Sequence, residues 1–516
     1  MTSKLKVIIL KPSKYGPDGF VERFRWGFMP NSTVPYIRSM TPPELDGIPL
    51  EVHTIDEYVH TNLSYLSLLS KAAGEETLLA LVGVQSHQFQ RALDLALYAR
   101  ARGCLVVIGG PHAMTCDTSL LHGRGISFAL AEAELAWRGI LGDALNGELR
   151  PVYGAEQRWQ RELESPVVIP PSGQDLRRYF MSMLGLYPAR GCPFVCNYCS
   201  VIKIAGRAVR SQSIETTIAS LKAAKRAGVQ LIMFTSDNFN KYSRAEELLA
   251  AMIEERINLP FLVQCDTQIV KQERLVGLLS RAGCFQIFLG VESFNRETLL
   301  AARKSQNRPE LYKDILRLCR HHRIYAHFST IIGFPPDTRA SVDQHIKTVC
   351  ELGPTWASFY VLCPIPGTEQ YADFLAKGMI TEKNLDRFDC TTLTWNHPNL
   401  SRPELQSLMF KAYSTFESLK HTGANLRQLN YKRGGLLSEA MTSLGYTVFN
   451  RYSALRKNHP MSGGVMRKRL DHVNDYLRPR RAFAGVDLLP LPQNLALPQA
   501  DQALNRIGDH TLQRAL

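Results

Sequence analysis

A short apolar run, Met183-Leu184-Gly185-Leu186-Tyr187, leads into the loop Ala189-Arg190-Gly191-Cys192-Pro193-Phe194-Val195-Cys196-Asn197-Tyr198-Cys199. Three thiols within eight residues, spaced CxxxCxxC, can converge on one metal centre, and thiolate is the ligand that iron–sulfur clusters select. Three ligands on a four-iron cube leave one iron open to a small molecule. The alternatives are three unrelated cysteines or a zinc site without its fourth ligand.

The chain around this loop alternates apolar runs with helical patterns. Ser213 can cap the first of these helices, and Gly228 can end it. Six β/α units in succession predict a partial (β/α)6 TIM-like barrel over residues 182–395, with its chemistry at the carboxyl ends of the strands. The expected strands are Met183–Tyr187, Val229–Phe234, Phe261–Gln264, Cys284–Leu289, Ala326–Ile332 and Ser358–Leu362.

The first 150 residues have the same alternation and predict a separate Rossmann-like α/β domain. Its clearest helix is Phe89–Arg102, which has one apolar face and one charged face. Residues 151–181 mix Pro, Gly and charged residues without periodicity and are expected to form a linker. The expected strands are Leu5–Lys11, Leu50–Ile55, Leu78–Gln85, Cys104–Gly109 and Ile126–Ala131.

The cysteine spacing after a first strand, with an aromatic residue at Tyr198, resembles the radical S-adenosylmethionine (radical SAM) enzymes. The resemblance implies a [4Fe-4S] cluster on Cys192, Cys196 and Cys199 whose open iron chelates S-adenosylmethionine. One-electron reduction then gives methionine and a 5′-deoxyadenosyl radical, which requires an electron donor such as flavodoxin or ferredoxin.

Four later strand ends resemble the same family, in order along the chain: Thr235-Ser236-Asp237-Asn238, Gly290-Val291-Glu292-Ser293, Gly333-Phe334-Pro335 and Pro364-Ile365-Pro366-Gly367-Thr368. The resemblance implies that Asp237, Asn238, Glu292 and Ser293 face S-adenosylmethionine, and that the turns at Gly333 and Pro364 lie near adenine and substrate. Taken singly, a carboxylate at a strand end is also explained by a helix cap, and a Pro-Gly pair is also explained by a turn.

The N-terminal strand ends resemble the cobalamin-binding domain that precedes the radical core in one large subfamily. The segments are Val82 to His87, Ile108 to Ala113, and Ala131-Glu132-Ala133-Glu134, where the subfamily usually has Gly-Glu-Gly-Glu. No DxHxxG motif is present, so cobalamin is expected to bind without a histidine as lower cobalt ligand. The alternative is a Rossmann-like domain that has lost cobalamin and only supports the core. The implied cobalamin-binding residues are Gly83, Gln85, Ser86, His87, Gly109, Gly110, Pro111, Glu132 and Glu134.

The eleven cysteines are an odd number, which argues against a secreted disulfide scaffold and predicts a reducing, cytoplasmic setting. The eight cysteines outside the loop lack ligand spacing and are expected to pack as small apolar residues. Only Cys104 and Cys116 lie in the N-terminal domain, which argues against the methylthiotransferase branch. Neither a signal peptide nor a transmembrane run is recognised.

Residues 396–516 are expected to form a mainly helical, basic region with a helix at Pro403–Leu419. Between Lys420 and Arg481 there are 13 Lys and Arg against 3 acidic residues, a balance of +10 within a chain of formal net charge +14. A solvated surface, an anionic substrate or peripheral membrane contact all fit, and nucleic acid is not expected. The final 30 or so residues are expected to be an extended or flexible tail.

The combined features predict a cobalamin-dependent radical SAM methyltransferase acting on an unactivated carbon or phosphorus centre of a small molecule or lipid. In the implied reaction, the deoxyadenosyl radical removes a substrate hydrogen and the substrate radical takes a methyl group from methylcobalamin. Two alternatives remain: a radical SAM oxidative cyclase or ring-forming enzyme, and a non-enzymatic Fe-S protein that binds nucleic acid.

Overall fold

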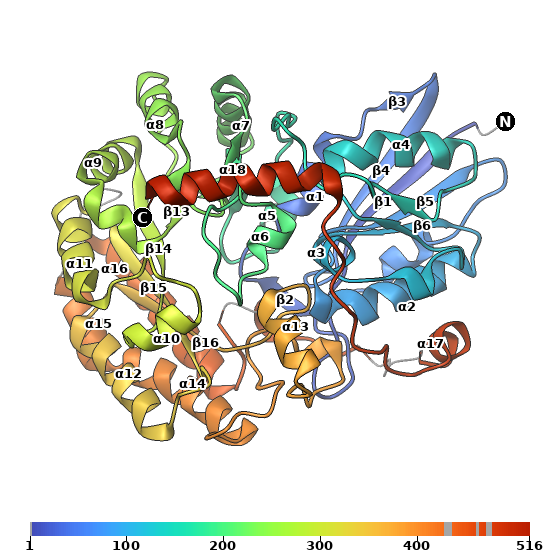
Figure 1. Cartoon of the computed structure of the whole chain (residues 1–516). Helices are drawn as coiled ribbons and strands as arrows, with labels where there is room; N and C mark the ends of the chain where they lie inside the picture. Colours follow the sequence, from blue (N-terminus) through green and yellow to red (C-terminus); the bar gives the residue numbers. More distant parts are fainter. Residues whose placement is uncertain (1–2, 428–435, 461–463, 471–476, 516) are drawn as a thin grey trace.

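The computed structural model describes residues 3–427, 436–460, 464–470 and 477–515. Figure 1 shows two α/β units side by side, an N-terminal unit (blue to cyan) and a barrel-like unit (green to yellow), joined by C-terminal segments (orange to red). The expected fold class, a Rossmann-like domain before a partial parallel barrel and a mainly helical C-terminal region, is confirmed.

The N-terminal unit is built on a seven-stranded sheet of order β3-β4-β1-β5-β6-β7-β8. All neighbouring pairs are parallel except β3 and β4. Because β8 belongs to this sheet, the domain continues a few residues beyond the expected boundary at residue 150. The strands are β1 (Leu5–Lys11), β3 (Glu44–Leu45), β4 (Ile48–Asp56), β5 (Glu76–Leu81), β6 (Leu105–Gly109), β7 (Ser127–Ala129) and β8 (Val152–Tyr153).

Helices cover both faces of this sheet. Helices α1 (Thr33–Ser39) and α4 (Ala133–Leu145) pack on the face that carries Val7 and Ile9. Helix α2 (Phe89–Arg100) packs on the opposite face with Ile8. The carboxyl ends of β5, β6 and β7 point toward the barrel, which is where a doubly wound sheet holds its ligands.

The second unit is a six-stranded, fully parallel sheet of order β16-β15-β14-β13-β12-β9. Ser213 caps α7 as expected, accepting a hydrogen bond from the Thr216 N–H at 3.0 Å. The strands are β9 (Met183–Leu186), β12 (Leu231–Phe234), β13 (Phe261–Cys265), β14 (Cys284–Glu292), β15 (Tyr325–Ile332) and β16 (Trp356–Val361). The helices are α7 (Ile214–Arg226), α8 (Ala245–Glu254), α9 (Glu273–Ala282), α10 (Arg296–Ala301), α11 (Tyr312–His321), α12 (Arg339–Leu352) and α13 (Glu369–Ala376).

The C-terminal region returns to both units instead of forming a separate body. Strand β17 pairs antiparallel with β2 (Phe24–Gly27) of the N-terminal unit. None of the helices within the described ranges is both long and apolar enough to cross a lipid bilayer. The elements are α14 (Arg402–Phe416), α15 (Leu419–Arg427), α16 (Leu436–Leu455), β17 (Gly464–Arg467), α17 (Leu477–Ala484) and α18 (Gln499–Ala515).

The expectation of an extended tail is wrong for residues 499–515, which form α18 across the front of the barrel (Figure 1). Leu504 of α18 is buried against Trp159. A Cβ at Gly508 would lie 2.4 Å from the Cβ of Arg207, so the helix backbone lies directly against the chain that follows the cysteine loop. Contacts with residues far away in sequence therefore hold this helix in place.

Several cations of the basic segment form ion pairs with acidic residues of the N-terminal unit. Arg480 is buried, and its Nε donates to Asp94 of α2 at 2.9 Å. Arg467 and Arg469 both pair with Asp18. Lys432 and Arg433 lie outside the described residues.

Candidate functional site

Hydrogen bonds from neighbouring elements shape the cysteine loop. The Gly191 N–H donates to the Asp237 carboxylate at 2.7 Å, and the Cys192 N–H donates to the Gly206 carbonyl at 3.1 Å. Side-chain amides approach two of the sulfurs: Gln306 Nε2 lies 3.7 Å from Cys196 Sγ, and Asn238 Nδ2 lies 3.9 Å from Cys192 Sγ. Amide donors near a thiolate sulfur are one way in which proteins tune a cluster.

The three thiols occupy a site that suits metal ligation. Burial raises the pKa of Cys192 and Cys196, and it raises the pKa of Cys199 to about 12. A buried thiol without a cation stays protonated, whereas a bound metal centre supplies the positive charge that stabilises the thiolate. The donor set therefore fits an iron–sulfur cluster.

Asp237 and Asn238 follow β12 and support this loop. Asp237 is half-buried, and burial raises its pKa to about 6. Asn238 Nδ2 donates to Asp266 at 2.9 Å, which ties the ends of β12 and β13 together. Both residues therefore lie at the cysteine loop, and their direct contact with S-adenosylmethionine stays a prediction.

Glu292 ends β14 in a left-handed conformation, with φ of 63°. Its carboxylate pairs with Lys304 at 2.7 Å, and the Lys304 Nζ lies 6.0 Å from the centre of the Tyr198 ring. The Tyr198 hydroxyl is buried and has no hydrogen-bond partner among the described residues. Sequence reasoning missed Lys304, because a single lysine after a helix carries no distinguishing signal.

Ser293 and Gly333 are the remaining residues predicted to bind cofactor in the barrel. Both lie at strand ends and form hydrogen bonds within the protein. The Ser293 hydroxyl accepts a hydrogen bond from the Asn295 N–H at 3.1 Å. The Gly333 N–H donates to Asp337 at 2.8 Å. These bonds shape the turns after β14 and β15, and ligand contacts of Ser293 and Gly333 stay predictions.

A mainly apolar cavity of about 250 Å³ lies between the two units. It extends from the carboxyl edge of the N-terminal sheet to Tyr187, Arg190 and Asp237 beside the cysteine loop. It thus brings together six of the nine residues expected to bind cobalamin. These six are Gly83, Gly109, Gly110, Pro111, Glu132 and Glu134, and apolar lining comes from Ala80, Val82, Val107, Trp137 and Ile140.

Gln85, Ser86 and His87 are not among the residues that line this cavity. The strand was predicted to continue to Gln85. In the structure β5 ends at Leu81, and a short 3-10 helix, Ser86–Gln88, follows. The Ser86 hydroxyl lies 3.0 Å from His112 Nδ1. Burial, reinforced by the charge of Lys14, lowers the pKa of His87 to about 3. These three residues therefore lie outside the lining of this cavity, and their contact with cobalamin stays a prediction.

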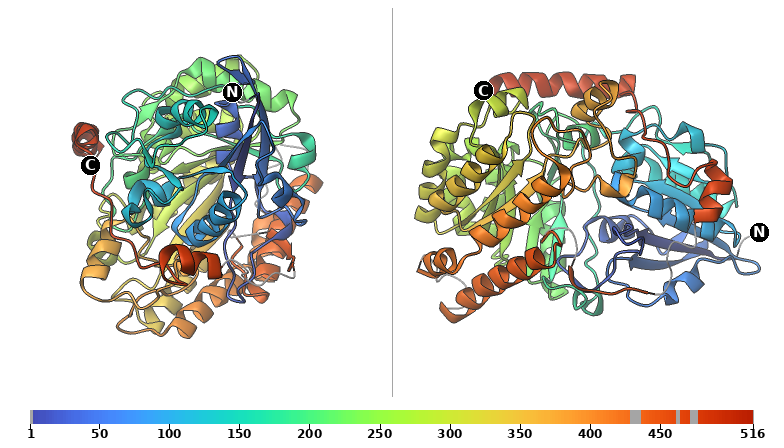
Figure 2. Two further views of the ribbon diagram at one scale, coloured as in Figure 1. Left: turned by 90° about the vertical axis from the view of Figure 1, so that its right-hand side faces the viewer. Right: turned by 90° about the horizontal axis from the view of Figure 1, so that it is seen from below.

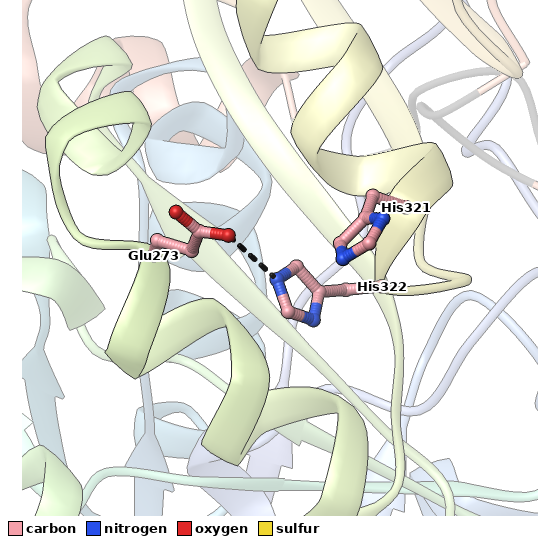
Figure 3. A group of neighbouring side chains, drawn as sticks. All are labelled: Glu273, His321 and His322. Carbon is pink, nitrogen blue, oxygen red and sulfur yellow. Dashed lines mark ion pairs between the residues drawn. The ribbon is translucent and has the colours of Figure 1, made fainter.

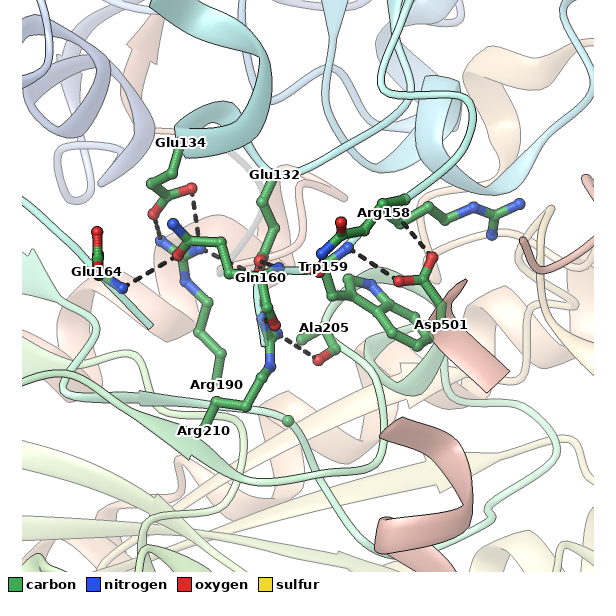
Figure 4. A network of polar contacts seen from close by, with 12 residues as sticks. Glu132, Glu134, Arg158, Trp159, Gln160, Glu164, Arg190, Ala205, Arg210 and Asp501 are labelled. Carbon is green, nitrogen blue, oxygen red and sulfur yellow. Dashed lines mark hydrogen bonds and ion pairs between the residues drawn. The ribbon is translucent and has the colours of Figure 1, made fainter. Parts of the chain in front are cut away.

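Glu132 and Glu134 point toward arginines of the barrel unit (Figure 4). Glu132 accepts hydrogen bonds from Arg210 at 2.8 and 2.9 Å, and Glu134 accepts one from Arg190 at 2.8 Å. Asp501 of α18 joins the same region by accepting the Arg158 N–H at 2.8 Å. The two glutamates thus connect the units, and a direct contact with cobalamin stays a prediction for both.

A second group of possible metal ligands lies on the outside of the barrel, where Glu273 begins α9 and His321 and His322 end α11 (Figure 3). His322 Nε2 lies 3.9 Å from a Glu273 oxygen, and both Glu273 and His321 are exposed. Exposed ion pairs of this kind contribute little to stability. This group is remote from the cavity and carries no functional assignment.

Residues 186–349 match the sequence model of the Radical SAM superfamily. The matched segment includes the three cysteines, which follow the first strand of the parallel barrel. The chain is therefore a radical SAM enzyme, and the prediction of a [4Fe-4S] cluster and S-adenosylmethionine as its cofactors is confirmed. The match also argues against the alternative of a non-enzymatic Fe-S protein that binds nucleic acid.

Among relatives, bacteriochlorophyllide d C-8(2)-methyltransferase of Chlorobaculum tepidum is 23% identical over 453 residues, 83% of this chain and 94% of the relative. Among solved structures, the cobalamin-dependent S-adenosylmethionine radical enzyme OxsB has a TM-score of 0.57 at 12% identity, covering 99% of this chain and 79% of that chain. The radical S-adenosylmethionine methyltransferase TsrM from Kitasatospora setae has a TM-score of 0.58 at 18% identity, covering 73% and 76%. The two structures confirm the fold.

Proposed function

We propose that this chain is a cobalamin-dependent radical SAM methyltransferase that methylates an unactivated carbon or phosphorus centre. The observation that carries the proposal is the cavity that runs from the N-terminal sheet edge to the cysteine loop, because it gives a second cofactor access to the radical site. The relative from Chlorobaculum tepidum, matched over most of both chains, is named as a methyltransferase.

The residues divide into two cofactor sites. Cys192, Cys196 and Cys199 would hold the cluster, and the cluster with S-adenosylmethionine would supply the radical. The cavity would receive part of cobalamin, the carrier of the methyl group, against the strand-end glycines Gly109 and Gly110.

The substrate belongs to the same proposal: a small molecule or a lipid, with the electron supplied by a flavodoxin- or ferredoxin-like donor. All eleven cysteines are free. Free thiols and a reducible cluster fit a reducing, cytoplasmic setting.

Cobalamin binding is tested by filling the cavity. Ala133 lines the cavity at the start of α4, whereas Leu135 on the same helix is 42% exposed and outside it. We expect the full-length protein to retain hydroxocobalamin through gel filtration, seen by its visible spectrum. Ala133→Trp should lose it and Leu135→Trp should retain it. Absence of cobalamin from the wild-type protein would leave only a supporting role for the N-terminal unit.

The reaction is tested with S-adenosylmethionine and titanium(III) citrate on the reconstituted, cobalamin-loaded protein. Methyl transfer chemistry should yield S-adenosylhomocysteine as well as 5′-deoxyadenosine. Formation of 5′-deoxyadenosine alone would contradict methyl transfer and support the ring-forming alternative. Cys196→Ala should abolish the cluster absorbance and both products, whereas Cys350→Ala, a half-buried cysteine of α12, should preserve them.

A further inference from the structure

Helix α16 has apolar residues on the face that it exposes to solvent. Met441, Leu444, Val448, Tyr452 and Leu455 are 62%, 44%, 58%, 42% and 74% exposed. Their spacing of three or four residues places them on one stripe along the helix. A soluble helix normally has polar residues on this face, so the stripe indicates a binding surface.

The opposite face of α16 fixes the helix to the protein. Phe449 stacks on Phe28 with ring centres 5.2 Å apart and on Phe180 at 6.0 Å. Ser453 and Ala454 are buried on the same side. The exposed stripe is therefore held on a packed element at the edge of the molecule, the orange-red helix at the lower edge of the right-hand view in Figure 2.

Neighbouring elements extend the apolar surface. Phe180 is 57% exposed next to Phe449, and its N–H donates to the Gly27 carbonyl. That bond links it to β2, where Trp26 is 36% exposed and lies opposite Val465 of β17. We name the surface formed by the α16 stripe, Phe180 and Trp26 the α16 face.

The charges beside the α16 face are positive. Arg451, Arg456 and Lys457 are exposed at the end of α16, and Arg456 lies over the Tyr452 ring at 5.4 Å. Arg25 lies over the Trp26 ring at 4.4 Å. Aromatic and basic side chains around an apolar helical stripe are the features of a protein surface that lies in the membrane interface.

We propose that the α16 face docks this enzyme on the surface of a membrane containing anionic phospholipids. A second copy of the chain is a poorer occupant, because a two-fold contact would bring the same cations together. Anionic headgroups instead pair with Arg451, Arg456 and Lys457, while the apolar side chains enter the boundary with the acyl chains. This inference is independent of the proposed reaction.

Vesicle sedimentation with the full-length protein tests the proposal. We expect the protein to pellet with vesicles of phosphatidylcholine and phosphatidylglycerol, less so at high salt and much less with phosphatidylcholine alone. The combined variant Leu444→Glu, Val448→Glu, Leu455→Glu should bind these vesicles about tenfold more weakly or worse. A matched variant with the same charge change, Leu120→Glu, Leu135→Glu, Leu300→Glu, alters exposed leucines elsewhere and should bind normally.

Three outcomes would overturn the proposal: a wild-type protein that does not pellet, equal loss of binding in the two triple variants, or a wild-type dimer that the α16-face variant converts to a monomer. Circular dichroism shows whether each variant is folded. If the α16-face variant is not folded, Arg451→Gln, Arg456→Gln, Lys457→Gln replaces it. Unchanged binding of this variant to the anionic vesicles would also overturn the proposal.

Discussion

Glu132 of the N-terminal unit and Arg210 of the barrel form a buried ion pair joined by two hydrogen bonds, at 2.8 and 2.9 Å. Burial alone would raise the pKa of Glu132, but the hydrogen bonds from Arg210 and the charge of Arg190 outweigh it and lower the pKa. The glutamate therefore contributes stability above its ordinary pKa, and this contribution is lost as the pH falls through its folded value. The pair fixes the N-terminal sheet edge against the cysteine loop.

Arg210→Met should destabilise the protein by about 3 kcal/mol. The substitution removes a buried cation, so the Glu132 carboxylate loses two hydrogen bonds and part of its charge compensation. Urea unfolding measures the change. Asp314→Asn is the matched control, since Asp314 and Arg317 form an exposed pair at 2.8 Å and should contribute less than about 1 kcal/mol. Equal costs for the two variants would show that the buried pair does not hold the interface.

Gly110→Ala should destabilise the protein by about 3 kcal/mol, because the new methyl group meets backbone that cannot yield. The φ of Gly110 is 129°, and a Cβ there would lie 2.3 Å from the Val84 nitrogen. Gly123→Ala is the control, with a φ of 70° and no atom within 4 Å of the added Cβ. Thermal unfolding should show a loss of only about 1 kcal/mol for the control. A similar loss in both variants would mean that the loop beside the cavity adapts.

Asn494→Ala should loosen the turn from Pro364 to Thr368. The Asn494 Oδ1 accepts the Gly367 N–H at 3.0 Å, and its Nδ2 donates to the Thr368 carbonyl at 2.9 Å. Losing both bonds should cost about 2 kcal/mol of stability. Because the resemblance to radical SAM enzymes implies that this turn lies near adenine and substrate, we also expect a higher KM for S-adenosylmethionine. The cluster absorbance should be unchanged. Asn399→Ala, which removes one exposed bond to the Asp337 carbonyl, should leave that KM unchanged.

Glu417 should make stability depend on pH. Its carboxylate is buried beneath α16 and accepts a hydrogen bond from Asn450 at 2.7 Å. Burial raises its pKa from 4.5 to about 7. The folded state therefore binds more protons than the unfolded state between these pH values, so this group lowers stability as the pH rises through that window, by about 3 kcal/mol in total.

Glu417→Gln should remove this slope and be more stable than the wild type at pH 8. Urea titrations at pH 5 and pH 8 measure both proteins. Glu297→Gln, at an exposed position in the first turn of α10, should leave the slope unchanged. An identical pH slope in wild type and Glu417→Gln would contradict the raised pKa.

The barrel could be predicted closely because buried parallel strands are continuous apolar runs that few other structures produce. β9 and β13, for example, each lie within one residue of the expected strand. The cysteine loop could be predicted for a similar reason, since its three thiols are adjacent in sequence. Features that depend on local sequence, such as the Ser213 cap, were also recovered.

Features created by distant contacts could not be predicted. The apolar run predicted a strand that continues to Gln85, but β5 ends at Leu81 and a short 3-10 helix, Ser86–Gln88, follows. Helix α18 has a weak local signal, and its position depends on Trp159 and Arg207, more than 290 residues earlier. Lys304 reaches Glu292 only because the chain after α10 folds back over β14.

The segment that leads into α18, together with the first turn of that helix, also constrains the order of assembly. Asn494 binds the Gly367 turn, Leu495 binds the Thr115 carbonyl, and Asp501 binds the Arg158 N–H. The eight residues 494–501 thus satisfy backbone groups in both units and in the linker. During synthesis these groups lack these partners until residues 494–501 have left the ribosome, because the partners are among the last residues to be made. The junction of the two units is therefore completed last, after each sheet has had time to form.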